Sequence, residues 1–163
     1  MTHTDSQEAS HDKPRGRPDT AVLVGFCTDK SDWISTLIRW VTWWKHSHVV
    51  LISPDRRKII EATHGKGVVL GDLLEFVQRD GCELRQIPHP YPNYVWEAAV
   101  SQVGKPYDWR YALDWITRRD WQDPGAWACS ELIAWAIDSV PEELRWRVSP
   151  RDIYLLTKPY QQP

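Results

Sequence analysis

Two apolar segments that flank a Pro-Asp pair are the feature that most constrains this chain. Residues 47–53 (SHVVLIS) and 57–63 (RKIIEAT) have the length and β-branched composition of strands, and Pro54-Asp55 between them is a turn signal. The pattern predicts an antiparallel hairpin. A turn of two or four residues centred on Pro54-Asp55 places His48 directly opposite Glu61, whereas a three-residue turn places His48 opposite Ala62.

The rest of the chain adds strands in the middle and helices on both flanks. We predict further strands over 21–26, 67–70 and 82–88, and helices over 31–44, 71–78, 92–104, 108–119 and from Cys129 to before Pro141. Runs of strands bordered by helices indicate an α+β fold, with a central antiparallel sheet packed by helices.

Composition bounds the class of protein. The chain has 163 residues, which suits one domain, and we assign residues 20–163 to it and residues 1–19 to a disordered polar tail. The net charge of -2 and scattered basic residues argue against nucleic-acid binding. Eleven tryptophans are expected in the core or along a groove.

The start of the sequence also carries an expectation about location. It lacks the apolar core of a Sec signal, and no apolar run approaches the ~20 residues that span a bilayer. We therefore expect synthesis in the cytoplasm, with delivery by a phage or a secretion machine if the protein acts outside the cell. Nothing in the sequence predicts an oligomeric state.

Cys129 is the first candidate for chemistry. It begins the hydrophobic helix in GAWACSELIAWAI (125–137), just after the break at Asp123-Pro124-Gly125. A helix N-terminus favours the thiolate, which is the nucleophilic form of cysteine, and residues 126–128 include no strong N-cap to compete for the first amides. The alternative is that Cys129 packs in the core with the apolar face of its helix. Three cysteines without short spacings do not indicate a disulfide framework or a cysteine zinc site.

A thiolate needs a base, and His48 is the candidate, because it lies on the inward face of its strand with Val50 and Ile52. Glu61 on the next strand is the expected orienting partner, and His64 is the second choice for this role. His48 and Glu61 also have plain structural readings, as a core histidine and its partner. A zinc site built from His46, His48 and His64 is a less favoured reading.

A set of segments follows in a fixed order from about residue 21 to residue 157: AVLVGF, WWKHSHVVLI, IIEAT followed by Gly-Val-Val, GKPYDW, WACSELI and Ser-Pro-Arg-Asp. This ordered set resembles the permuted papain-fold cysteine hydrolases, in the YiiX-like branch related to the NlpC-type cell-wall peptidases, and more distantly the lecithin retinol acyltransferase-like proteins. It implies a circularly permuted papain-like fold, since the order along the chain is His, Glu, Cys.

The resemblance also implies roles for individual residues. Cys129 would be the nucleophile, His48 the base and Glu61 the third member of the triad, with the Cys129 backbone N–H as an oxyanion donor. Tyr107 and Trp127 would contact the substrate, although an aromatic core position is the plainer reading of Tyr107. No metal or other cofactor is implied.

The expected activity is hydrolysis of an amide or peptide bond, with bacterial cell-wall (peptidoglycan) peptides as the favoured substrate. One alternative is a lipid-directed thioesterase or acyltransferase with the same triad, in which the Trp-rich helix 31–44 contacts a membrane; a helix packed on the sheet is the favoured reading of that segment. Another is a non-catalytic, aromatic-lined binding module.

Overall fold

The structure, a computed structural model, describes residues 20–28, 36, 43–110, 125–139 and 141–160. The predicted tail at 1–19, most of the predicted helix at 31–44 and nearly all of that at 108–119 lie outside the described residues.

Within the described residues, six strands form one antiparallel sheet in the order β4-β3-β2-β1-β5-β6. They are β1 Ala21–Cys27, β2 His48–Ile52, β3 Lys58–Thr63, β4 Gly67–Asp72, β5 Glu83–Pro88 and β6 Lys158–Pro159. The sheet and its helices confirm the predicted α+β class. The strand predicted at 67–70 continues to Asp72, and β6 was not predicted.

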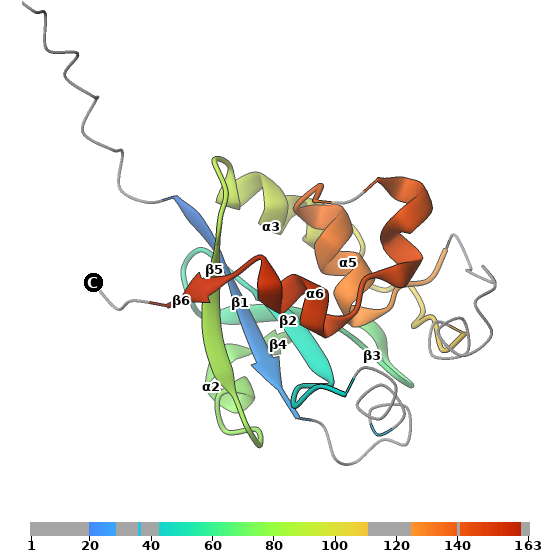
Figure 1. Cartoon of the computed structure of the whole chain (residues 1–163), viewed down its shortest axis with the longest axis horizontal. Helices are drawn as coiled ribbons and strands as arrows, with labels where there is room; N and C mark the ends of the chain where they lie inside the picture. Colours follow the sequence, from blue (N-terminus) through green and yellow to red (C-terminus); the bar gives the residue numbers. More distant parts are fainter. Residues whose placement is uncertain (1–19, 29–35, 37–42, 111–124, 140, 161–163) are drawn as a thin grey trace, which may run out of the picture.

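The helices are α2 Leu73–Phe76, α3 Pro92–Val100, α5 Cys129–Ala136, the 3-10 helix η1 Glu142–Arg147 and α6 Pro150–Leu155. α3, α5 and α6 gather over one side of the sheet, and α2 lies apart from them (Figure 1). The predictions at 71–78 and 92–104 were both too long. η1 and α6 were missed, although Ser149 and Asp152 form a capping box around Pro150 at the start of α6.

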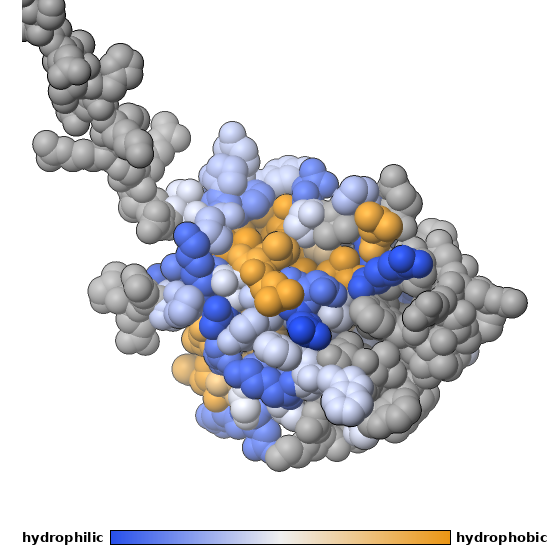
Figure 2. Space-filling model, viewed as in Figure 1, coloured by the Kyte–Doolittle hydropathy of each residue, from blue (hydrophilic) through white to orange (hydrophobic). Residues whose placement is uncertain are grey.

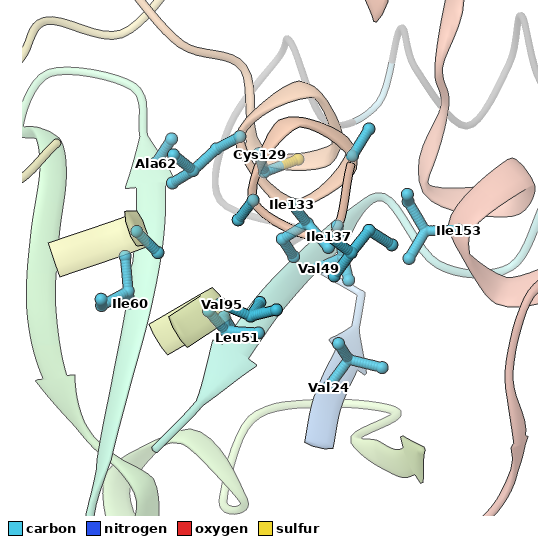
Figure 3. Close-up of a cluster of buried hydrophobic side chains, with 14 of the residues drawn as sticks. Val24, Val49, Leu51, Ile60, Ala62, Val95, Cys129, Ile133, Ile137 and Ile153 are labelled. Atoms are coloured by element: carbon cyan, nitrogen blue, oxygen red, sulfur yellow. The ribbon is translucent and has the colours of Figure 1, made fainter. Parts of the chain in front are cut away.

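Both faces of the central strands are buried, which explains why β2 is apolar at successive positions. Val49 and Leu51 pack in the cluster that includes Ile133 of α5 and Ile137, the C-cap residue of that helix (Figure 3). Val50 and Ile52 face the other way and pack with the smaller cluster around Phe76. Since successive side chains of a strand point to opposite faces, the same strand can hold a helix on each side.

Gly25 on β1 is required by this second cluster. A Cβ atom at residue 25 would lie 2.3 Å from the Phe76 ring, which is far inside van der Waals contact. The missing side chain therefore lets the Phe76 ring pack directly on the strand, and this contact anchors the short helix α2 to the sheet.

The hairpin formed, but its predicted register was wrong. Leu51 pairs with Ile60 and Ile52 with Ile59, so the turn spans residues 54–57 and is centred one residue later than expected. Arg56 in this turn has φ 57°, and the Ser53 side chain accepts hydrogen bonds from the backbone N–H groups of Arg57 and Lys58. Continued, this register leaves Glu61 diagonal to His48 instead of opposite. A shift of two residues keeps both side chains on one face of the sheet, so they still meet.

The surface over α6 exposes apolar side chains. Hydrophobic residues gather near the centre of the face seen in Figure 2, and Leu155 and Leu156 at the end of α6 are 69% and 46% exposed. In the part of the chain that the structure describes, no helix is long and apolar enough to cross a bilayer.

Candidate active site

Cys129 is the first residue of α5, as expected. Its N-cap residue, Ala128, has extended backbone (φ −84°, ψ 159°) and makes no side-chain hydrogen bond to the helix. The Glu131 carboxylate accepts a hydrogen bond from the Ala128 N–H at 3.3 Å, so half of a capping box is present. The sulfur therefore lies at a helix start whose cap position offers no competing side-chain acceptor.

His48 connects Cys129 to Glu61. Its Nε2 atom lies 2.7 Å from the Glu61 Oε2 atom, and the His48 ring also makes a side-chain hydrogen bond with Cys129. The structure thus brings together the three residues that the sequence singled out, and Glu61, not His64, is the partner of the imidazole.

These contacts determine the charge of the histidine. Burial lowers the pKa of His48, but the hydrogen bonds and charges of Cys129 and Glu61 outweigh it and raise the pKa to about 10. At neutral pH the imidazole is therefore protonated and can pair with a thiolate on one side and a carboxylate on the other.

Arg79, which sequence analysis did not single out, completes the cluster. Its Nη1 and Nη2 atoms donate to the two carboxylate oxygens of Glu61, at 2.6 Å to Oε2 and 2.7 Å to Oε1. Burial raises the pKa of Glu61, but the hydrogen bonds from Arg79 and His48 lower it to about 2. Glu61 is therefore a carboxylate at every physiological pH.

A second cysteine, Cys27, lies next to this cluster and is buried, as Cys129 is. Cys27 on β1 is paired with His48 in the sheet register. Burial raises the pKa of the Cys27 thiol to about 12, despite a hydrogen bond with Arg79. Burial likewise raises the pKa of Cys82. Both thiols are therefore protonated at neutral pH and unsuited to nucleophilic attack.

Tyr107 and Trp127 are brought together beside α5. They form a parallel bridge in which the Trp127 N–H donates to the Pro106 carbonyl at 3.0 Å and the Asp108 N–H donates to the Trp127 carbonyl at 3.1 Å. Trp127 is buried, with its ring 5.2 Å from that of Trp135. The indole packs in the core cluster together with Cys129, and the substrate contact expected for Trp127 stays a prediction.

Tyr107 remains a candidate for substrate contact. It is half-buried, and its ring meets the exposed His64 edge to face at 6.0 Å. The loop that carries it is also tied to β4: the Lys105 carbonyl accepts a hydrogen bond from the Val68 N–H at 2.8 Å. Gly67, with φ 75°, is required there, since a Cβ would lie 2.2 Å from that carbonyl. Tyr107 is thus held between β4 and the start of α5.

The predicted face shared by His46 and His48 is not present. The His46 Nε2 atom lies 3.2 Å from Glu83, and the His46 ring packs against Phe26 and Tyr154, whereas His48 turns to Glu61. Within the described ranges no group of three His, Cys, Asp or Glu side chains could hold a metal ion. The zinc reading therefore fails for His46, His48 and His64.

Comparison with known proteins does not assign a family. No protein-family model matches this chain, and no curated protein is significantly similar to it in sequence. The functional assignment therefore depends on the chemistry of the site.

Proposed function

We propose that this protein is a cysteine hydrolase of permuted papain-like fold that cleaves an amide or peptide bond through Cys129, His48 and Glu61. The observation that carries the proposal is the position of His48, hydrogen-bonded to Cys129 on one side and to Glu61 on the other. A nucleophile, a base and an orienting carboxylate in this order form a catalytic triad, whatever their order along the chain.

The reaction follows from the charges. The Cys129 thiolate attacks the substrate carbonyl carbon and forms a tetrahedral oxyanion, which the backbone N–H of Cys129 at the start of α5 helps to stabilise. The His48 imidazolium gives its proton to the leaving amine, and the carbon–nitrogen bond breaks. His48, now neutral, takes a proton from water, whose oxygen attacks the thioester, releasing the acid and restoring the thiolate.

The proposed reaction also requires a fixed orientation of the imidazole and a side chain that contacts the substrate. Glu61 fixes the imidazole through Nε2, so that the ring stays oriented for its hydrogen bond with Cys129. We assign substrate contact to Tyr107, which is held between β4 and the start of α5. Peptidoglycan peptides are the proposed substrate class, because the order of segments resembles that of the NlpC-type hydrolases.

The test is digestion of purified peptidoglycan and of isolated stem peptides, with the products identified by mass spectrometry. We expect new amine and carboxylate termini with the wild-type protein and none with Cys129→Ala. Cys82→Ala is the matched control and should keep the activity, since no hydrogen bond joins Cys82 to the triad residues in the described structure. Equal turnover by wild type and Cys129→Ala would contradict the proposal.

A lipid ester or thioester is the second candidate substrate, with the same triad. The supporting observation is exposed apolar surface, including Trp43, which is 88% exposed, and Leu155 on α6. Co-sedimentation with neutral and with anionic vesicles, followed by assay of acyl release, tests it. Binding together with Cys129-dependent acyl release favours the lipid substrate, and no sedimentation with either vesicle rejects it.

The third candidate function is that of a binding module without catalytic activity. Alkylation of Cys129 by iodoacetamide at about pH 6 separates this case, because an activated thiolate reacts faster there than a free thiol does. An alkylation rate no higher than that of a free thiol would remove both catalytic candidates.

A further inference from the structure

We propose that Arg79 is a positioning residue of the triad, holding Glu61 in the orientation in which its Oε2 atom accepts from His48. This inference rests on the proposed function of Cys129, His48 and Glu61. Arg79 is the described side chain that donates to both oxygens of Glu61.

The geometry gives Arg79 control over the direction of the carboxylate. Oε2 accepts from Arg79 at 2.6 Å and meets His48 at 2.7 Å, while the hydrogen bond shown for Oε1 comes from Arg79 alone. Two parallel bonds to a planar guanidinium fix the plane of a carboxylate, which a single bond does not. The Glu61 side chain is 7% exposed, so water is a poor substitute for the lost partner.

Arg79 is itself held in place. It follows α2, where its N–H donates to the Phe76 carbonyl at 3.0 Å, and its guanidinium lies 5.2 Å from the centre of the Phe76 ring. The side chain also hydrogen-bonds with Cys27. Because Phe76 is anchored on β1 at Gly25, the guanidinium has a fixed position relative to the sheet.

Arg79, Glu61 and His48 alternate in charge, and Cys129 hydrogen-bonds with His48 at the end of this row. Glu61 is faced by His48 from β2, by Cys27 from β1 and by Arg79 after α2, with Cys82 near Cys27. Cys27 and Cys82 are both protonated at neutral pH, since burial raises the pKa of each thiol. Glu61 therefore has two positively charged neighbours: His48, which belongs to the proposed triad, and Arg79, which does not.

The experiment measures alkylation of Cys129 by iodoacetamide as a function of pH, so it needs no substrate. The tryptic peptide that spans residues 120–145 contains Cys129 and neither Cys27 nor Cys82, and mass spectrometry reports its modification separately. The variants are Arg79→Met, which removes the guanidinium, and Arg79→Lys, which keeps the charge and loses the paired bonds.

Arg85→Met is the matched control. Arg85 donates to the Glu83 carboxylate at 2.9 Å and stacks on Tyr154, and no side-chain hydrogen bond joins Arg85 or Glu83 to His48 or Glu61 in the described structure. It tests what the loss of a half-buried arginine–carboxylate pair does to the fold alone.

We expect Arg79→Met to lower the alkylation rate about tenfold or more near pH 5 and several-fold near pH 8, so that the acid limb moves to higher pH. The reason is that Glu61 without its guanidinium takes up a proton in mild acid and releases His48. Arg79→Lys should lie between wild type and Arg79→Met. Arg85→Met should lower thermal stability and leave the profile unmoved.

A double variant keeps the test decisive if Arg79→Met folds poorly. Replacing Glu61 with Gln removes the group through which Arg79 is proposed to act and leaves no buried carboxylate unpaired. In the Glu61→Gln background, Arg79→Met should therefore cause no further shift in the profile.

Three results would overturn the proposal: an Arg79→Met profile that matches wild type, a uniform loss at all pH values equal to that of Arg85→Met, or an undiminished Arg79 effect in the Glu61→Gln background. These outcomes are distinct from failure of the proposed function. A reactive, Arg79-dependent Cys129 in a protein that hydrolyses nothing would reject the hydrolase and keep the positioning role.

Discussion

Two clusters in this molecule contain a histidine, a glutamate and an arginine, and they leave the histidine in opposite states. In the first, His48 uses one ring nitrogen for Glu61 and also hydrogen-bonds with Cys129, and its pKa is raised. In the second, His46 meets Glu83 through Nε2, and its buried Nδ1 atom has no hydrogen-bond partner among the described residues. Burial lowers the pKa of His46, so that imidazole is neutral.

The difference lies in what surrounds each carboxylate. Glu61 is shared between His48 and Arg79, whereas Glu83 also binds Lys45, Arg85 and the Tyr154 hydroxyl. These donors connect Glu83 on β5 to the residues just before β2 and to Tyr154 of α6. The hydrogen bond with His46 is only one of those that share this carboxylate. The second difference is a further partner for the imidazole: His48 also hydrogen-bonds with Cys129, whereas His46 Nδ1 has no hydrogen-bond partner among the described residues. The comparison teaches that a histidine, a glutamate and an arginine alone do not set the charge of the imidazole.

Replacing each histidine with glutamine is the change that separates the clusters most. His48→Gln should lower the rate of Cys129-dependent hydrolysis by roughly 10³-fold or more, since base and proton donor are both lost. His46→Gln should change it by no more than a few-fold. Initial rates on the same peptide substrate measure both, and equal losses in the two variants would mean that His48 has no special role.

Replacing each glutamate with glutamine should give a smaller difference in hydrolysis rate between the two clusters. Glu61→Gln should lower the rate by about 10²-fold, because the imidazole loses charge stabilisation but keeps a hydrogen-bonding neighbour. Glu83→Gln should leave the rate nearly unchanged and lower the free energy of unfolding by roughly 1–3 kcal/mol. Denaturant unfolding and the rate assay together check this, and a rate loss in Glu83→Gln matching that of Glu61→Gln would erase the distinction.

A substitution at Gly25 on β1 should disturb the cluster of His48, Glu61 and Arg79 and leave the cluster of His46 and Glu83 unchanged. Gly25→Ala pushes the Phe76 ring off the strand, which should destabilise the fold by about 1–3 kcal/mol and loosen the Arg79 guanidinium packed on that ring. Phe76→Leu, combined with Gly25→Ala, restores space and should recover part of the stability. Thermal melts of the three variants measure this, and a double variant no more stable than Gly25→Ala would show that the ring is not the obstacle.

The smallest effect is on the pH dependence of stability. Because the folded pKa of His46 is below its ordinary value of about 6.5, the unfolded chain binds a proton that the folded protein does not. His46 therefore lowers stability as the pH falls below about 6.5. In His46→Gln the decline between about pH 6.5 and pH 5 should be shallower than in wild type, by denaturant titration at each pH. Parallel declines would show that His46 titrates as it does in the unfolded chain.

Sequence patterns predicted the parts of this site that depend on local order. The apolar runs gave β2 and β3, and the helix start gave Cys129. The register was wrong because turn geometry depends on Arg56 adopting a left-handed conformation, which nothing in Pro54-Asp55 signals. The error was harmless, since a shift of two residues preserves the face. Whether the whole fold is a permuted papain-like one stays a prediction.

Arg79 and Trp127 show what local patterns miss. Arg79 lies in a polar stretch after a one-turn helix, and its role comes from a long-range contact with Glu61 that periodicity does not encode. The contacts of Trp127 were likewise not predicted: its ring packs against that of Trp135, and its Nε1–H donates to the Gln102 side chain at 3.1 Å.

Ala128 at the N-cap of α5 should lower the stability of the helix and raise the reactivity of Cys129. A serine or aspartate at a cap position typically strengthens a helix by about 1 kcal/mol, because its oxygen accepts from the first-turn amides. Here that oxygen would compete with the sulfur, and later with the substrate oxyanion, for the same N–H groups. Ala128→Ser is therefore a change that a search for thermostable variants would select and that a search for fast ones would discard.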